Sequence, residues 1–456
     1  MTSPALDLLR KYSVPGPRYT SYPTAPYFHT GFSEADWHAA LAEADPARGL
    51  SLYAHIPFCD SLCYYCGCNM VATRDYSKTV PYLAALDREM AATAARVDPA
   101  RRVRQLHWGG GTPTYLNPDD IRRLMDRMRH HFTLADAAEV SCEVDPRELT
   151  FEHLAALRET GFNRVSFGVQ DMDPAVQEAV NRIQSEFLIR QVLDWSRELG
   201  FSSINLDLIV GLPKQSVTSF RRTLDRVTAW APDRLAVFAY AHVPWMKKHQ
   251  KLINEADLPD LATRLDLQQA VNEMLGDAGY VNIGLDHFAR PEDELVRAQQ
   301  NKTLWRNFQG YTTHKDCDIL AFGASSISQT ADVYMQNEKS LKRYEDLAGT
   351  TGFAVERGLR LTRDDQIRRD AITRVMCDLE LDFDAFGREW DIRFTDYFAE
   401  SLADLAPLAD DGLIEIGASR LQVTPTGRLF LRNIGMGFDR YLKDAASDQP
   451  RYSRTA

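Results

Sequence analysis

The chain has 456 residues, of which 44% are hydrophobic and 26% are charged. This composition is that of a globular protein and excludes a disordered, collagen-like or disulfide-scaffold class, and the length predicts one large domain with at least one smaller one. The formal net charge of −11 argues against a general affinity for nucleic acids or anionic membranes, because both would repel the protein.

The chain shows no targeting or membrane segment. Residues 1–10 lack the apolar region of a signal peptide, and no apolar run approaches the roughly 20 residues needed to span a bilayer. Four of the seven cysteines fall between positions 59 and 68, and in a reducing compartment such crowding favours a metal site over disulfides. We therefore expect a cytoplasmic protein without a membrane span.

Residues 1–48 are predicted to form an N-terminal arm. The prolines in residues 14–23 block a continuous helix or strand, so this stretch should run extended over the main domain. Because it carries Arg18, Tyr19 and Tyr22, the arm could cover an active site. Simple packing of a leader segment on the surface is the alternative.

From residue 50 onward, short apolar segments alternate with amphipathic ones, which predicts an α/β fold with a parallel sheet. Six strand–helix units fit either a doubly wound sheet or a partly closed barrel, and both architectures place ligands at the carboxyl ends of the strands. The predicted strands are 50–56, 105–108, 139–144, 164–169, 203–209 and 234–240. The predicted helices are 80–97, 119–131, 186–199, 216–231 and 261–277.

The pattern changes after about residue 355. Residues 362–365 resemble a capping box that begins a helix through Cys377. A helix (395–409), two short strands (413–416 and 420–423) and a helix from near Pro425 should follow. This order resembles a winged helix, often a DNA-binding fold, but in an acidic chain an accessory domain is the better interpretation. The predicted domains are 1–48, 49–355 and 356–456.

A cysteine loop follows the first predicted strand, with Cys59, Cys63, Cys66 and Cys68 in the spacing C-x3-C-x2-C-x-C. Spacings of three and two let one tight loop bring three thiolates to three irons of a cubane, which leaves the fourth iron open to a substrate. Cys68 is too close to Cys66 to reach a different corner easily, so we expect three ligands: Cys59, Cys63 and Cys66. A structural zinc site is the alternative, although it usually requires a second cysteine pair.

The C-x3-C-x2-C motif after a strand resembles the radical S-adenosylmethionine (SAM) superfamily. Further motifs extend the likeness over nearly the whole chain, and together they resemble the family of oxygen-independent coproporphyrinogen III oxidases. These motifs are residues 16–20, 55–59, 66–69, 107–114, 143–147, 168–171, 207–209, 286–290 and 307–313.

The resemblance implies a partial (β/α)6 TIM-like barrel with an N-terminal arm and a mainly helical, winged-helix-like C-terminal domain. It implies an enzyme that oxidatively decarboxylates two propionate side chains of coproporphyrinogen III to vinyl groups, giving protoporphyrinogen IX in haem biosynthesis. The implied cofactors are a [4Fe-4S] cluster and two molecules of SAM, whose 5'-deoxyadenosyl radical takes a hydrogen from the propionate β-carbon. The resemblance also implies a monomer, and the reaction needs an electron donor and acceptor that the sequence does not identify. No nucleic-acid partner is expected, because the chain is acidic.

The resemblance also implies the residues that hold SAM, although it assigns no catalytic residue. Glycines permit close backbone approach, and carboxylates at strand ends can accept from ammonium or hydroxyl groups; a simple turn and a salt-bridged barrel rim are the alternatives. For the substrate propionates, Arg18, Arg182 and Arg290 are candidates by residue type. The implied SAM residues are Tyr53, Tyr65, Gly110, Gly111, Thr112, Glu143, Gln170, Arg182, Asp207, Ala241 and Ile327.

A paralogous family of haem chaperones is the nearest alternative, because it shares the cluster motif. It carries an aromatic residue in place of Cys68, lacks the arm, and has His-Asn-x-x-Tyr-Trp where this chain has Arg-Asn-Phe-Gln-Gly-Tyr at 306–311. All three features favour the oxidase.

Overall fold

The computed structural model describes residues 4–442 and 452–455, so residues 1–3, 443–451 and 456 of the first and last predicted domains lie outside it. A twelve-stranded sheet forms its centre, in the order β16-β15-β14-β13-β1-β4-β5-β6-β7-β8-β10-β9. Among the helices of the described residues, none combines the length and the apolarity that a membrane span requires.

Seven neighbouring strands of this sheet are parallel. They are β13 (Cys317–Phe322), β1 (Gly49–Ile56), β4 (Val103–Gly110), β5 (Leu134–Val144), β6 (Arg164–Gln170), β7 (Ser203–Val210) and β8 (Arg234–Ala239). The six predicted strands are all among them. Strands β1 and β4 to β8 follow one another in chain order, as in barrel winding, whereas a doubly wound sheet would reverse its order part-way.

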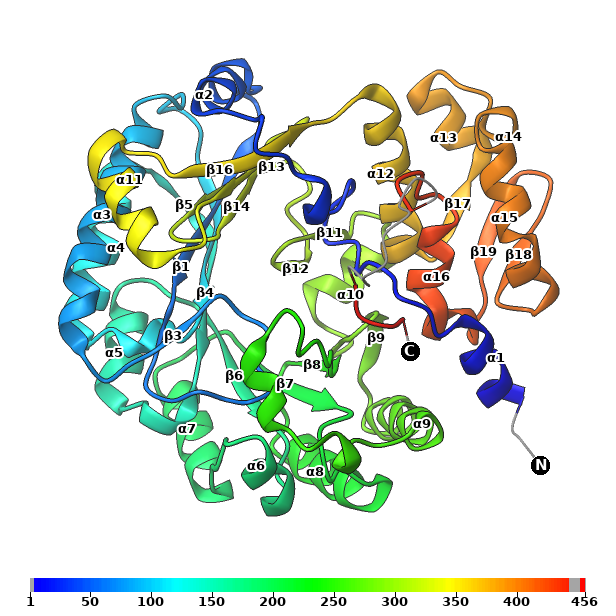
Figure 1. Cartoon of the computed structure of the whole chain (residues 1–456), viewed down its shortest axis with the longest axis horizontal. Helices are drawn as coiled ribbons and strands as arrows, with labels where there is room; N and C mark the ends of the chain where they lie inside the picture. The colour runs from blue at the N-terminus through cyan, green and yellow to red at the C-terminus, as the bar shows by residue number, and fades with distance from the viewer. Residues whose placement is uncertain (1–3, 443–451, 456) are drawn as a thin grey trace.

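Amphipathic helices cover the outer face of these strands (Figure 1). Their apolar faces are buried against the strands, as Leu86 and Met90 of α3 (Thr79–Ala94) show. All five predicted helices form, and α5 and α6 were not predicted. The helices are α3 (Thr79–Ala94), α4 (Pro118–His131), α5 (Phe151–Glu159), α6 (Pro174–Ala179), α7 (Glu186–Glu198), α8 (Val217–Ala229) and α9 (Leu261–Asp277).

Antiparallel strands extend the sheet on both sides and were not predicted. On one side lie β14 (Ile327–Gln329), β15 (Val333–Asn337) and β16 (Val355–Arg360), and on the other β10 (His287–Ala289) and β9 (Val281–Gly284). In the described part of the chain the edge strands β16 and β9 do not pair with each other, so the barrel is open. The other elements of this region are α10 (Glu294–Gln300), β11 (Trp305–Asn307), β12 (Gly310–Thr312) and α11 (Leu341–Thr351).

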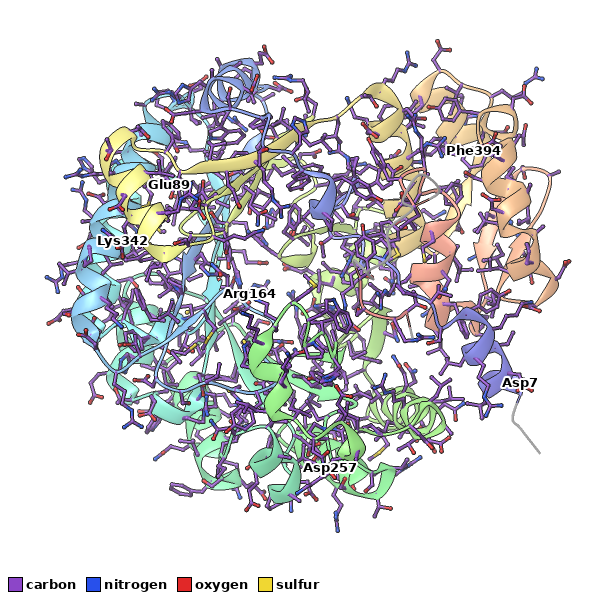
Figure 2. All side chains as sticks on the ribbon, in the orientation of Figure 1. Asp7, Glu89, Arg164, Asp257, Lys342 and Phe394 are labelled. Carbon is purple, nitrogen blue, oxygen red and sulfur yellow. The ribbon has the colours of Figure 1, made fainter. Side chains whose placement is uncertain are left out.

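Ion pairs fill the barrel at the amino ends of its strands. Arg164 pairs with Glu139 at 3.2 Å and with Glu294 at 2.6 Å, and Figure 2 shows its side chain near the middle of the barrel. Arg234 pairs with Asp293 at 2.7 Å and with Glu294 at 3.1 Å. Because this end is filled by protein charges, the carboxyl ends of the strands are the side available to a ligand.

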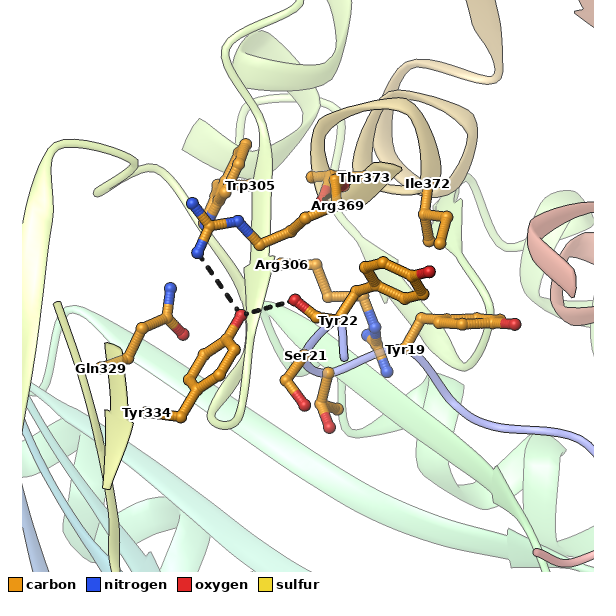
Figure 3. A pocket seen from close by; sticks show the side chains of 11 residues that line it. Tyr19, Ser21, Tyr22, Trp305, Arg306, Gln329, Tyr334, Arg369, Ile372 and Thr373 are labelled. Carbon is orange, nitrogen blue, oxygen red and sulfur yellow. Dashed lines mark hydrogen bonds between the residues drawn. The ribbon is translucent and has the colours of Figure 1, made fainter. Parts of the chain in front are cut away.

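The N-terminal segment begins with α1 (Pro4–Tyr12) and then runs extended through residues 14–23, as predicted, before α2 (Glu34–Glu43). Its tyrosines anchor it to the rest of the chain. Tyr19 donates to Asp439 at 2.9 Å, and the backbone oxygen of Tyr22 accepts from Tyr334 at 3.3 Å. In Figure 3 the dashed lines join Tyr334 to Tyr22 and to Arg369 beside a cavity of about 10 Å³, which is room for one water molecule.

The C-terminal region is a second packed unit. The predicted capping box is present, since Thr362 and Asp365 bond each other's backbone at the start of α12. The predicted helix 395–409 is interrupted at Phe398, and the last helix begins at Leu431 rather than near Pro425. The elements are α12 (Arg363–Asp378), β17 (Glu380–Asp382), α13 (Phe383–Trp390), α14 (Phe394–Tyr397), α15 (Ala399–Asp410), β18 (Ile414–Ile416), β19 (Arg420–Val423), a 3-10 helix (Gly427–Phe430) and α16 (Leu431–Met436).

A short antiparallel sheet, β17-β19-β18, lies among these helices, which is the winged-helix arrangement predicted. The core of the unit is aromatic: Phe383 and Phe394 stack with their ring centroids 4.3 Å apart, and Phe394 is labelled in Figure 2. The apolar core of this unit also includes Leu9 and Tyr19 of the arm and Ile283 of β9, so the unit packs on both the arm and the barrel.

Candidate active site

The cysteine loop begins directly after β1, at the carboxyl edge of the parallel strands. Cys59 ends the two-residue strand β2 (Phe58–Cys59), which pairs with β3 (Val71–Ala72). Two backbone hydrogen bonds tie this loop to the glycine-rich loop after β4: Gly111 donates to Ile56 at 2.8 Å and Thr112 donates to Phe58 at 2.9 Å. The two predicted cofactor loops are therefore one packed unit.

Each of the three predicted ligand thiols has its own polar neighbour. Cys59 Sγ lies 3.4 Å from the Thr112 hydroxyl, and Cys66 Sγ accepts from the backbone N–H of Cys68 at 3.4 Å. Cys63 Sγ accepts from two guanidinium groups, those of Arg147 at 3.3 Å and Arg182 at 3.4 Å. Donors and cations of this kind stabilise negative sulfur, whether as thiolate or as cluster ligand.

The thiols lie close enough to influence one another. Burial, together with the charges of Cys66 and Cys63, raises the pKa of Cys59 to about 12. The hydrogen bond from the Cys68 side chain lowers the pKa of Cys66 to about 6. Among the described residues, however, no group of three or more His, Cys, Asp or Glu side chains is arranged to hold a metal ion. The structure brings the thiols together without placing them in a ready ligand geometry.

Arg182 links the cysteine loop to the barrel. It is 6% exposed and donates to Asp145 at 3.0 Å and to the Gly168 carbonyl at 2.6 Å, as well as to Cys63. Burial raises the pKa of Asp145, but Arg182 and Arg147 outweigh it and bring the pKa to about 2, so this carboxylate stays charged. The Nε of Arg182 is buried without a hydrogen-bond partner among the described residues. A donor left over beside the thiols fits a ligand bound there.

Glu143 ends β5 and faces the glycine-rich loop. It accepts from His107 at 3.3 Å and from the Gly110 amide at 3.2 Å. Burial raises the pKa of Glu143, but the hydrogen bond and charge of His107 outweigh it, so the pKa is lowered and the group is a carboxylate at neutral pH. A carboxylate at this edge is an acceptor suited to an ammonium or hydroxyl group.

The glycines are required by the protein itself. Gly110 has φ +118°, a conformation that favours glycine, and a Cβ on Gly111 would lie 2.8 Å from the backbone of Pro57. A Cβ on Gly109 would lie 2.9 Å from Glu143. The glycines thus allow the cysteine loop and Glu143 to approach the loop after β4, a reason that the sequence alone did not reveal.

Two histidines that were noted only within motifs also belong to the site. The ring of His107 stacks on that of Tyr53 with centroids 5.9 Å apart. Tyr53 also lies 3.1 Å from Nδ1 of His55, whose Nε2 lies 2.8 Å from the Asn69 carbonyl. Their signal in the sequence was a polar residue at alternate positions of otherwise apolar strands.

The next two strand ends carry Gln170 and Asp207, as predicted. Gln170 has φ +64° at the end of β6. Asp207 accepts from Ser166 and Asn205, each at 2.8 Å, and burial raises its pKa to about 7. These groups lie at the same edge of the sheet as Glu143, whose charge also raises the pKa of Asp207.

The remaining predicted cofactor residues are more scattered. Gln250 donates to the backbone oxygens of Tyr65 at 2.9 Å and Ala241 at 3.2 Å, and so joins the cysteine loop to the loop after β8. Ile327 instead begins β14 and packs with Phe28 in a separate apolar cluster. Ile327 therefore belongs to a different apolar cluster from Tyr65, which packs on Val180 and Ile209.

The three arginines proposed by type for the propionates lie in different places. Arg290 donates to the Pro232 carbonyl at 3.1 Å, which precedes β8, so it lies at the amino edge and away from the site. Arg182 is enclosed by the protein groups described above. Arg18 pairs with Asp286 at 2.7 Å and lines a large cavity. Residue type alone could not distinguish these positions.

Comparisons with known proteins are extensive. Residues 53–227 match the Radical SAM superfamily, and residues 361–430 match the HemN C-terminal domain. Oxygen-independent coproporphyrinogen III oxidases of Salmonella typhimurium and Escherichia coli K12 are each 51% identical over 449 residues, covering 98% of both chains. That of Pseudomonas aeruginosa is 48% identical, also with 98% coverage of both chains.

A solved structure also matches over nearly the whole chain. It is described as "Coproporphyrinogen III oxidase (HemN) from Escherichia coli is a Radical SAM enzyme", with a TM-score of 0.92 and 50% identity. The alignment covers 96% of this chain and 98% of that one. The likeness therefore includes the arm, the barrel and the C-terminal unit.

Proposed function

The chain belongs to the family of oxygen-independent coproporphyrinogen III oxidases within the radical SAM superfamily, and we propose that Cys59, Cys63 and Cys66 ligate its [4Fe-4S] cluster. Family membership makes the protein an oxidoreductase of haem biosynthesis that decarboxylates two propionates of coproporphyrinogen III. The observation that supports the ligand assignment is the loop itself, in which three thiols follow β1 and two guanidinium groups contact Cys63.

When bound, the cluster supplies the electron that cleaves SAM, and the resulting 5'-deoxyadenosyl group removes a hydrogen atom from the propionate β-carbon. The side chains of this protein bind and orient the reactants. Arg147 and Arg182 offset the negative charge of the thiolates, and Glu143, ionised at neutral pH, can accept from the ammonium group of SAM. The loss of carbon dioxide, and of one electron to the electron acceptor, would then complete each vinyl group.

The strand ends suit a second polar ligand group. Asp207 has a pKa of about 7 and two neutral donors, so it can accept a hydroxyl hydrogen bond in either protonation state. Gln170 and Arg182 offer further donors at the same edge. These groups support the proposal that two SAM molecules bind between the cysteine loop and the ends of β5 to β7.

Cellular context forms part of the same proposal. All seven cysteines are free thiols, which supports a reducing compartment such as the cytoplasm. The enzyme acts as a monomer and receives its electron from a donor that neither the fold nor the comparisons identify. The proposed domain division is an arm of residues 1–48, a barrel with its extension in residues 49–355, and a C-terminal accessory domain in residues 356–456.

The proposal is tested by an anaerobic turnover assay on enzyme reconstituted with iron and sulfide. With a reductant, SAM and coproporphyrinogen III, we expect carbon dioxide and protoporphyrinogen IX. Tight haem binding without turnover would support the chaperone alternative and overturn the assignment.

A further inference from the structure

A cavity of about 910 Å³ lies between the barrel and the C-terminal unit. Its walls come from β8 and the loop after it, from α9, from the arm near Arg18, and from residues 425–432 and 452–455. Figure 1 shows α9, the arm and the end of the chain lying around this region. Apolar side chains such as Val237, Leu265 and Phe288 line part of it. Its volume suits a large organic ligand.

The cavity is strongly cationic although the chain is acidic. Among the described residues that line it, Asp286 is the one carboxylate, whereas five are arginines. The whole chain carries a net charge of −11, so this concentration of positive charge is local and built by the fold. The five arginines are Arg18, Arg264, Arg428, Arg432 and Arg454.

The single carboxylate does not neutralise these arginines. Asp286 bonds Arg18 at 2.7 Å. Arg432 is 8% exposed and donates to four backbone carbonyls and the Ser453 hydroxyl, with no carboxylate among these partners. Burial, together with the charge of Arg18, lowers the pKa of Arg432 to about 10. A buried cation of this kind is costly unless an anion joins it.

Two further arginines line the cavity from separate parts of the chain. Arg264 lies on α9 and Arg428 on the 3-10 helix before α16, and neither forms an ion pair with any described residue. Burial lowers the pKa of both, and the charge of Arg454 lowers that of Arg264 further. Nε of Arg264 donates to the Pro259 carbonyl at 3.2 Å, which leaves the terminal nitrogens of Arg264 and the guanidinium of Arg428 available to a ligand carboxylate.

Arg306 adds a buried cation behind this wall. It is 7% exposed, and its Nε and Nη1 have no hydrogen-bond partner among the described residues. Its charge is one of those that lower the pKa of Arg432. Figure 3 shows Arg306 beside Tyr19 and Tyr22 of the arm. The arm thus covers a group of arginines rather than an apolar core alone.

The ligand that this cavity fits is an amphipathic polycarboxylate, because apolar walls meet several unpaired guanidinium groups. We propose that the cavity binds the carboxylates of the tetrapyrrole substrate through Arg264 and Arg428, with Arg432 adding positive charge to the same wall. This inference rests on the proposed function for the identity of the tetrapyrrole. The cavity reaches Ala241 in the loop after β8, so a macrocycle held there adjoins the strand-end site.

The charge count also favours product release. Coproporphyrinogen III carries four propionates, and each conversion of a propionate to a vinyl group removes one carboxylate. Protoporphyrinogen IX therefore keeps two of the four anions and loses part of its attraction to the arginines. The same side chains that hold the substrate would bind the product more weakly.

Fluorescence titration of the reconstituted holoenzyme tests this proposal, with coproporphyrin III as the stable four-carboxylate probe. Charge reversal in Arg264→Glu or Arg428→Glu should weaken binding by about tenfold or more, and Arg264→Gln and Arg428→Gln should weaken it less. Arg190→Glu, on the exposed face of α7, is the matched control and should leave affinity unchanged. Both Gln variants should still fold, because the side chains of Arg264 and Arg428 are not fully buried.

Two further probes define the chemistry. The tetramethyl ester of coproporphyrin III keeps the ring but not the charges, and it should bind weakly to every variant. Protoporphyrin IX should bind more weakly than coproporphyrin III, and stronger binding would contradict the release argument. The proposal is overturned if both charge-reversed variants bind coproporphyrin III as tightly as Arg190→Glu. Turnover by the wild-type enzyme is measured separately, so failure of the proposed function is distinguishable.

Discussion

Arg182 donates to the sulfur of Cys63 at 3.4 Å and, through the same nitrogen, to the carboxylate of Asp145 at 3.0 Å. One buried guanidinium therefore connects a predicted cluster ligand to the end of β5. Arg147 contacts the same two groups. Positive charge is thus built into the cysteine loop from its most buried side.

Replacement of Arg182 by Met should destabilise the protein. Asp145 would lose one of its two cations while remaining buried, which we expect to cost about 3 kcal/mol. The depressed pKa of Asp145 contributes stability above its unfolded pKa, near 4, and this stability is lost as the pH falls toward 2. In the variant, acid unfolding should begin at higher pH.

Guanidinium chloride denaturation and acid titration measure both effects, with Arg190→Met as an exposed control. Equal denaturation midpoints for the two variants would show that the Arg182–Asp145 pair contributes little.

The ligand assignment predicts different iron contents for two serine variants. Cys59→Ser should lose the cluster, because a three-thiolate site cannot spare one ligand. Cys68→Ser should retain about four irons per chain, since Cys68 is exposed and the variant keeps the backbone N–H that donates to Cys66 at 3.4 Å. Iron and sulfide analysis after anaerobic reconstitution distinguishes them. Loss of the cluster from Cys68→Ser would refute the three-ligand assignment.

The glycine-rich loop predicts a second contrast. In Gly111→Ala the new Cβ would lie 2.8 Å from the backbone of Pro57 and Phe58, so we expect a loss of about 2 kcal/mol and a displaced cysteine loop. Gly67→Ala, in the cysteine loop, serves as the control, because its new Cβ would meet nothing within 4 Å. Thermal unfolding and iron retention are the measurements. Equal behaviour of the two variants would contradict the packing argument.

The raised pKa of Asp207 predicts a pH-dependent stability. Because its folded pKa of about 7 exceeds its unfolded value near 4, its contribution to stability is present below pH 4 and is lost as the pH rises through 7. Asp207→Asn removes this titration. Without added SAM, the variant should gain stability relative to wild type between pH 4 and 7, with no further gain above about pH 8. Parallel stability curves across this range would exclude a raised pKa.

Local patterns predicted the parallel part of the fold well. In strand β7, half-buried Asn205 and Asp207 alternate with buried Ile204, Leu206 and Leu208, and α9 formed over the predicted range. The strands β9, β10 and β14 to β16 were missed because they are three to six residues long and depend on pairing with neighbours. Such short segments carry too few alternating positions to be recognised alone.

Only those parts of the site that lie in recognisable sequence motifs could be predicted. The cysteines and strand-end groups follow from spacing and topology, but the positions of the charged arginines became clear only from the three-dimensional structure. Arg290 was a candidate by type, yet it lies at the amino edge, and Arg264, Arg428 and Arg432 were not considered. They come from a helix and a C-terminal unit far apart in the sequence, and only tertiary packing brings them to one cavity.

The central claim is that the cysteine loop supports radical removal of hydrogen from the substrate's propionates. Coproporphyrinogen III labelled with deuterium at the propionate β-carbons tests it directly in a single anaerobic incubation of reconstituted enzyme with SAM and reductant. Mass spectrometry should find deuterium in the 5'-deoxyadenosine formed, together with divinyl product. Unlabelled 5'-deoxyadenosine, or recovery of the tetrapyrrole with all four carboxylates, would contradict the claim.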